Sequence, residues 1–178
     1  GLAKAVATPQ PSGVMRTLPT LTFALDWWRG RGANPGTFKT TNLVIHALTA
    51  LALAWFLRTL LLAVGTPASR ACWLAPVLAL AWAAHPLHVS AVLYTVQRLQ
   101  TMGTLFLVLA LIAYLGARRA QIAGRPARTQ WLLTALCWVA AMSCKEDSAL
   151  LPAYTLALEL TVLRFAATEQ RMTKLLQG

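Results

Sequence analysis

Apolar runs separated by short polar connections take up most of this chain, and they leave few ways for it to fold. The longer runs cover residues 40–64 and 99–117, and shorter ones cover 71–84, 130–144 and 149–165. A helix that crosses a bilayer needs about 20 predominantly apolar residues. The pattern therefore predicts an all-α polytopic membrane protein with about five transmembrane helices.

The composition supports a membrane setting over a nucleic-acid-binding one. Of 178 residues, 57% are hydrophobic and 12% are charged, against about 25% charged in a soluble domain. The net charge of +11 comes mostly from basic residues in the gaps between apolar runs. That placement is typical of membrane topology, and no nucleic-acid-binding motif accompanies it, so we expect membrane lipid and no nucleic acid as a partner.

The first 36 residues are punctuated by proline and glycine and contain one short amphipathic stretch, TLPTLTFALDWW. It is too short to span a bilayer, and Trp27 and Trp28 suit the headgroup region, so we expect an interfacial helix. We expect a non-cytoplasmic segment over 1–36, a transmembrane domain over 37–165 and a cytoplasmic tail or linker over 166–178. Without an initiator Met or a signal-peptide pattern, the chain is expected to be a fragment of a longer protein.

The arginines predict which side of the membrane each connection faces. If five spans alternate, one side collects most of the basic residues and almost no acid, which makes it cytoplasmic by the positive-inside rule. The opposite side receives the N-terminal segment, HPLHVSAVLYTVQR and CKED. The basic side collects Arg58, Arg70, Arg118, Arg119, Arg125, Arg128, Arg164, Arg171 and Lys174.

HPLHVSAVLYTVQR carries most of the polar candidates. Arg98 either anchors a helix end in the headgroups or faces a cavity and holds a phosphate through its planar fork. Gln97 favours the cavity, because amides are costly against lipid tails, and Tyr94 lies one helical turn back. His85 and His88 suit hydrogen bonding or acid–base work, or simply face the interface. They lack an obvious third ligand, so we expect no metal.

Other polar residues fall at the same side of the membrane. Lys145 and Glu146, followed by Asp147, abut a span with almost no loop around them, so they form either a solvated turn or a phosphate-binding pair. Asn42 and His46 share a helix face one turn apart, where they serve either a site or interhelical hydrogen bonding.

Glu159 lies deeper and is expected to pair with Arg164 or Arg58. The three cysteines, Cys72, Cys137 and Cys144, fit apolar packing.

The order of these motifs resembles the transmembrane and tetratricopeptide-repeat family of O-mannosyltransferases, and most closely its bacterial relatives. The resemblance runs from about residue 13 to 165 and depends on order and spacing rather than on any one motif. The matching residues are Arg16, Leu18 and Pro19; Asn42 and His46; His85, Pro86 and His88; Gln97 and Arg98; and Lys145 and Glu146.

The resemblance implies a GT-C type glycosyltransferase of the bacterial inner membrane, without a cofactor. It would take a sugar from a polyprenyl-phosphate donor and pass it to a protein or glycan acceptor at the periplasmic face. Arg98, Lys145 and Arg16 would bind the donor phosphate, supported by His85, His88, Gln97, Tyr94, Glu146, His46 and Asn42. The general base, the first span, the first large loop and the repeats would lie outside this chain, and the fragment alone would be inactive.

Two other functions remain open from the residues themselves. A non-enzymatic membrane scaffold or accessory subunit would use the same polar residues only to hold helices together. A transporter or flippase of a lipid-linked solute would carry polar residues through the middle of the membrane, where this chain has little charge besides Glu159. Transport is therefore the third choice.

Overall fold

The computed structural model describes residues 16–166, and that part of the chain is helical and contains no strand. The all-α prediction is confirmed. The longer helices are α2 (Thr17–Arg29), α3 (Pro35–Ala63), α4 (Ala68–Ala83), α6 (Arg98–Ile122), α7 (Arg128–Met142) and α8 (Leu151–Leu158). Short elements between them are η1 (Pro86–His88), α5 (Val89–Leu93), η2 (Thr95–Gln97), η3 (Glu146–Leu150) and the π-helical turn η4 (Glu159–Leu163).

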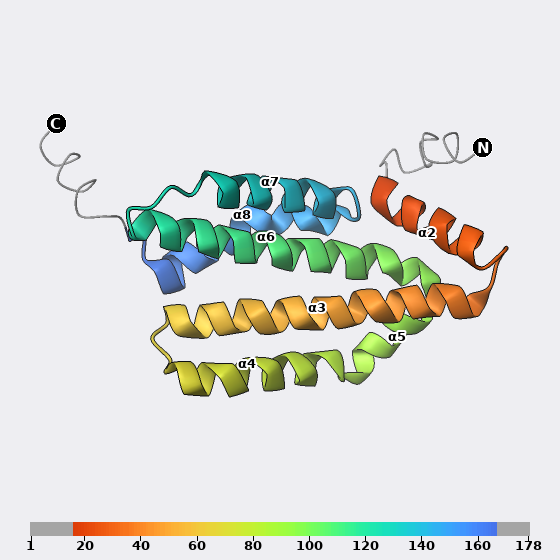
Figure 1. Cartoon of the computed structure of the whole chain (residues 1–178), viewed down its shortest axis with the longest axis horizontal. Coiled ribbons are helices and arrows are strands. Elements are labelled where there is room, and N and C mark those ends of the chain that lie inside the picture. Colours follow the sequence, from red (N-terminus) through yellow and green to blue (C-terminus); the bar gives the residue numbers. More distant parts are fainter. Residues whose placement is uncertain (1–15, 167–178) are drawn as a thin grey trace, which may run out of the picture.

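Four helices lie side by side in the order α4, α3, α6, α7, and α8 packs against α6 (Figure 1). Short turns join α3 to α4 and α6 to α7, and the two helices of each pair run antiparallel. We call one end of the bundle the basic end, formed by the turns at 64–67 and 123–127 and by the last residues described, 164–166. The other is the polar end, formed by α2, η1, α5, η2 and η3.

The charged residues separate between these two ends as alternating helices require. The arginines expected on the cytoplasmic side lie at or near the basic end wherever the structure describes them. The histidines and the carboxylates of Asp26, Glu146 and Asp147 lie towards the polar end. Residues 1–15, the tail from 167 onward, and Arg171 and Lys174 within it, lie outside the described part.

Two helices of the described part, Pro35–Ala63 and Thr95–Ile122, are long and apolar enough to cross a membrane. This is fewer than the expected five. At about 1.5 Å per residue, the 16 residues of α4 and the 15 of α7 are well short of a 30 Å hydrocarbon core. The fifth expected span is shorter still, because α8 ends at Leu158 and continues only as the π-helical turn η4.

Large apolar side chains face outward on these helices, and small ones face inward. On α4, Ala71, Ala75 and Ala79 are buried against the bundle while Trp73 is 78% exposed. Val139 on α7 is likewise exposed. A soluble domain seldom leaves so much apolar surface open, whereas helices packed through small residues with bulky ones outside suit a lipid environment.

The connection from α4 to α6 is broken into short pieces. His85 is extended because it precedes Pro86, and α4 therefore ends at Ala83 instead of continuing through the proline. A second extended residue, Tyr94, separates α5 from η2. HPLHVSAVLYTVQR is therefore a folded connection at the polar end, and not one continuous helix.

Candidate functional site

Arg98 is the first residue of α6 and is completely buried. Its Nε donates to Asn42 Oδ1 on α3 at 2.7 Å, and one terminal nitrogen donates to the Phe38 carbonyl oxygen at 3.0 Å. The same nitrogen lies 2.7 Å from the carboxylate of Asp26 on α2, which is 1% exposed. A buried charge is tolerated only when it is paired and hydrogen-bonded, and Arg98 meets both conditions with groups from α2 and α3.

Aromatic rings close the remaining sides of this guanidinium. The centre of the guanidinium lies 4.6 Å from the Phe23 ring centroid and 5.6 Å from that of Phe38, distances at which a cation is attracted to a ring face. Its other terminal nitrogen donates to Thr22 Oγ at 3.3 Å. We call Arg98, Asp26, Asn42, Phe23 and Phe38 the arginine clamp, because it joins α2, α3 and α6.

The arginine clamp differs from what the sequence led us to expect of Arg98. The sequence left two roles open, an anchor in the headgroups or a phosphate ligand facing a cavity, and in the structure the guanidinium is buried among groups of α2 and α3. The sequence does not indicate Asp26 as its partner, because 72 positions separate the two residues and no short-range pattern links them. One feature of the sequence could have indicated Asp26. It is an acidic residue within a short amphipathic helix that otherwise faces an apolar bundle.

Asn42 has a second task besides holding Arg98. Its Nδ2 donates to the carbonyl oxygens of Val92 and Tyr94, both at 3.3 Å. These carbonyls lie where α5 ends, so the amide satisfies backbone groups that the broken connection leaves open. The Tyr94 side chain is exposed, and Gln97 is half-buried beside the clamp.

Three histidines and one tryptophan form a second group, which we call the imidazole cluster. The His46 ring stacks on Trp82 with centroids 5.3 Å apart and lies 5.6 Å from His88. The rings of Trp82 and His88 are 4.3 Å apart, and His85 lies 6.4 Å from His88. The structure thus brings His46 of α3 together with the two histidines of the His-Pro-x-His element.

Burial and like charge act on His88 within this cluster. Desolvation lowers the pKa of His88 below its ordinary value, and positive charge on His46 or His85 lowers it further. His88 therefore tends to stay neutral. Among residues 16–166, no three histidine, cysteine or acidic side chains are placed to hold a metal ion together.

A third group lies at the surface of the polar end, where α2 begins and α7 ends. Arg16 donates to Glu146 at 3.3 Å, and Lys145 donates to Gln100 and pairs with Asp147 at 3.1 Å. We call these five residues the surface ion group. The Glu146 pKa is lowered, chiefly by a hydrogen bond from its own backbone amide and further by the positive charge of Arg16. Both cations keep part of their side chains exposed, 29% for Arg16 and 36% for Lys145.

At the basic end Glu159 pairs with Arg118, and not with the expected Arg164 or Arg58. Arg118 also donates to Gln121 Oε1 and to the Ala166 carbonyl oxygen, both at 3.0 Å, and Tyr114 donates to Glu159 at 2.6 Å. The expectation was wrong because it placed Arg118 in a loop. Helix α6 in fact continues to Ile122 and carries this arginine alongside η4.

Two adjoining hollows lie along α3 and α4. The α3–α4 groove, about 630 Å³, is lined mainly by Ala47, Ala50, Leu51, Ala79 and Leu80. The histidine hollow, about 300 Å³, is lined by His46, His85 and His88 together with apolar residues of α3 and α5. Both hollows share His46, Ala83 and Ala84 as lining residues, so they adjoin at this point.

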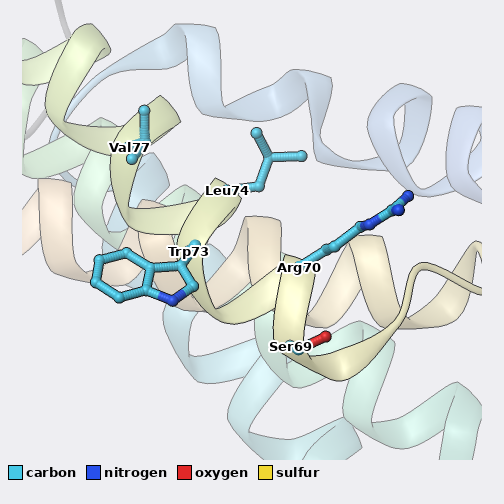
Figure 2. A pocket seen from close by; sticks show the side chains of 5 residues that line it. All are labelled: Ser69, Arg70, Trp73, Leu74 and Val77. Atoms are coloured by element: carbon cyan, nitrogen blue, oxygen red, sulfur yellow. The ribbon is translucent and has the colours of Figure 1, made fainter.

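A third, shallower hollow lies on the outside of α4 near the basic end. Figure 2 shows Ser69, Arg70, Trp73, Leu74 and Val77 around it, with the Trp73 ring and the Arg70 guanidinium pointing away from each other. A tryptophan beside a long cation at a helix start is typical of an interfacial anchor. This hollow brings together no groups suited to catalysis.

Comparison with known proteins points to a distant relationship with protein O-mannosyl-transferases. The chain is 30% identical over 139 residues to protein O-mannosyl-transferase Tmtc2 of Drosophila melanogaster, and 30% identical over 139 residues to protein O-mannosyl-transferase TMTC4 of Homo sapiens. These alignments cover 76% and 74% of this chain but only 14% and 19% of the relatives. No protein-family model matches the chain, and no solved structure matches it.

Proposed function

We propose that this chain is the membrane-embedded part of a GT-C type glycosyltransferase. In this proposal a sugar passes from a polyprenyl-phosphate donor to a protein or glycan acceptor at the periplasmic face of a bacterial inner membrane. The observation that carries the proposal is the similarity to two protein O-mannosyl-transferases over about three quarters of the chain. The gathering of cations, amides and imidazoles at one end of an apolar bundle supports it.

The surface ion group is the best candidate for the donor phosphate. Exposed ion pairs contribute little to stability, about 0–1 kcal/mol, so Arg16 and Lys145 can exchange a carboxylate for a phosphate at small cost. Two cations at the leaving phosphate would stabilise the charge that develops as the sugar departs. Glu146 and Asp147 would then hold the cations in place while the site is empty.

We assign Arg98 a positioning role in this reaction. The arginine clamp fixes the start of α6, and Gln100, which holds Lys145, lies half a turn further along the same helix. Loss of the clamp would therefore displace the surface ion group without removing any group that contacts the donor.

The five-span arrangement is part of the proposal. Helices α4, α7 and α8 are short, and a bilayer can thin locally around short helices at a cost of fractions of a kcal/mol per Å. Their exposed apolar faces favour insertion beside α3 and α6. The basic end would then be cytoplasmic by the positive-inside rule, and the surface ion group would be periplasmic.

Binding of a polyprenyl monophosphate, measured by native mass spectrometry in detergent, tests the proposal. The double variant Arg16→Gln/Lys145→Gln is expected to bind at least about tenfold more weakly, since a hydrogen bond to a charged group contributes about 1.5–3 kcal/mol. Arg119→Gln/Arg125→Gln at the basic end removes the same charge and is expected to bind like the wild type. Equal loss in both variants, or in neither, would overturn the assignment.

A scaffold or accessory subunit is the second candidate, and the arginine clamp is the observation that favours it. Arg98 is fully buried and bonds to groups of both α2 and α3, as interhelical stitching would require. In that case Arg98→Ala lowers stability and leaves lipid binding unchanged, and Arg16→Gln/Lys145→Gln has no effect on phosphate binding.

A further inference from the structure

The α3–α4 groove and the histidine hollow together have the shape and polarity of an amphiphile site. The groove is lined almost entirely by aliphatic side chains, and at His46 it adjoins the hollow where three imidazoles gather. Neither hollow is lined by an arginine, lysine, aspartate or glutamate of the described residues. The site therefore suits a hydrocarbon chain that ends in a polar but uncharged head.

His46, at the junction, indicates what that head must offer. Its Nε2 lies 3.1 Å from the Ala83 carbonyl oxygen, and because a carbonyl can only accept, Nε2 carries the proton. In the neutral ring Nδ1 is then an acceptor. This Nδ1 is buried and has no hydrogen-bond partner among residues 16–166, and the residue as a whole is 93% buried, so the ring has to turn slightly to meet a bound molecule. Leaving such an acceptor unpaired is costly, and a hydroxyl donor would recover that cost.

The surrounding rings favour an uncharged head over a phosphate. The lowered pKa of His88 keeps that imidazole neutral, and no arginine or lysine of the described residues lines either hollow. An anionic head placed here would lose its hydration without gaining a charged partner.

We propose that this combined site binds a membrane amphiphile with one hydrocarbon chain and an uncharged, hydroxyl-bearing head. The chain lies in the α3–α4 groove, and a head hydroxyl donates to His46 Nδ1. The site is separate from the phosphate-binding surface ion group, and it rests on the proposed function only for the membrane setting. An apolar helix or a second copy packed in the groove would fill it but would leave Nδ1 unpaired.

The test uses a monoacylglycerol with a photoactivatable diazirine in its chain, with the chain of 178 residues in phosphatidylcholine nanodiscs. Labelled peptides are expected from residues 47–54 and 76–84. Monooleoylglycerol should compete for this labelling about three- to tenfold better than oleoyl lysophosphatidic acid, which has the same chain and a phosphate head, because one hydrogen bond is worth about 0.5–1.5 kcal/mol.

Two variants separate the chain site from the head site. Ala47→Phe fills the groove at an exposed alanine and is expected to abolish the labelling, whereas Leu136→Phe, on the exposed face of α7, leaves it unchanged. His46→Gln places its amide nitrogen where Nε2 lies and so retains the bond to Ala83, but it has no acceptor at Nδ1. It is expected to weaken competition by monooleoylglycerol about three- to tenfold.

Three outcomes would overturn the proposal: labelling spread evenly over all apolar faces, equal competition by the two lipids, or a dimer by light scattering whose interface protects residues 47–54. The result is also independent of sugar transfer. Arg16→Gln/Lys145→Gln should leave the labelling unchanged, so a failed phosphate site and a failed amphiphile site give different patterns.

Discussion

The two ends of the bundle each contain an arginine that pairs with a carboxylate, and the two pairs are built differently. At the polar end Arg98 and Asp26 are 0% and 1% exposed and join three helices. At the basic end Arg118 and Glu159 are 17% and 9% exposed and join α6 to η4. The same chemistry thus forms a closed internal clamp at one end and a pair within reach of water at the other.

The difference in burial between the two ion pairs reflects how α2 and α8 are attached to the rest of the bundle. Helix α2 has 13 residues, of which only Pro19 and Asp26 are buried, and a deeply buried ion pair with aromatic walls secures it. Helix α8 already packs against α6 through Leu151 and Leu158, in a cluster with Leu111 and Leu115. The Arg118 pair therefore adds to a contact that exists without it.

The largest expected effect comes from breaking the polar-end pair. Asp26→Asn leaves the Arg98 guanidinium buried without a counter-charge and is expected to lower the free energy of unfolding by about 3–5 kcal/mol. Thermal unfolding in detergent, followed by circular dichroism, measures the loss. The double variant Asp26→Leu/Arg98→Met removes both charges and should be much more stable than Asp26→Asn. If both variants are equally unstable, the unpaired charge of Arg98 is not the cause of the loss.

The matching change at the basic end should cost less. Glu159→Gln keeps a hydrogen-bond acceptor for Tyr114, and water can reach Arg118, so we expect a loss of about 1–2 kcal/mol. The same unfolding measurement serves both ends. A loss at Glu159 equal to that at Asp26 would remove the distinction between a closed and an open pair.

The imidazole cluster makes the polar end sensitive to pH. Because the pKa of His88 in the folded state lies below its ordinary value of 6.5, the unfolded state binds more protons as the pH falls. The stabilisation from His88 is fully present above pH 6.5 and is lost as the pH falls through the folded-state value. Thermal unfolding from pH 7.5 to 5.5 should therefore depend on pH more steeply in the wild type than in His88→Gln, and parallel curves would contradict this.

The smallest effect on stability is expected in the surface ion group. Arg16→Gln removes an exposed pair with Glu146 and should change the free energy of unfolding by no more than about 1 kcal/mol. Chemical unfolding measures this, with Arg119→Gln at the basic end as the control. A loss of several kcal/mol would show that Arg16 is structural and would remove it from the phosphate-binding candidates.

Helix positions could be predicted from the sequence, while long-range pairs could not. Apolar runs and proline positions placed the helices to within a few residues; for example, the expected 40–64 is observed as Pro35–Ala63. Only two helices of the described part are long enough to span a membrane, because the runs at 71–84, 130–144 and 149–165 form helices of 16, 15 and 8 residues. The partners of Asp26 and Glu159 depend on how helices pack, and a helix end misplaced by one turn, as at Arg118, is enough to change the partner.

Part of the candidate site could also be predicted from the sequence. The resemblance brought His46, His85 and His88 into one set, and the structure gathers their rings. The resemblance also grouped Arg98 with Lys145 and Arg16. All three residues are cations, and residue type alone does not distinguish a buried cation from an exposed one. The decisive difference, an aspartate and two phenylalanine rings around Arg98, exists only in three dimensions.

The arginine clamp has a mechanical consequence for the molecule. Because one guanidinium holds groups of both α2 and α3, these two helices cannot tilt independently of the first turn of α6. We therefore expect a displacement of α2 to move the first turn of α6, and with it Gln100 and its partner Lys145. A short helix that lies across the end of a bundle thus works as a lever on the group of charges beside it.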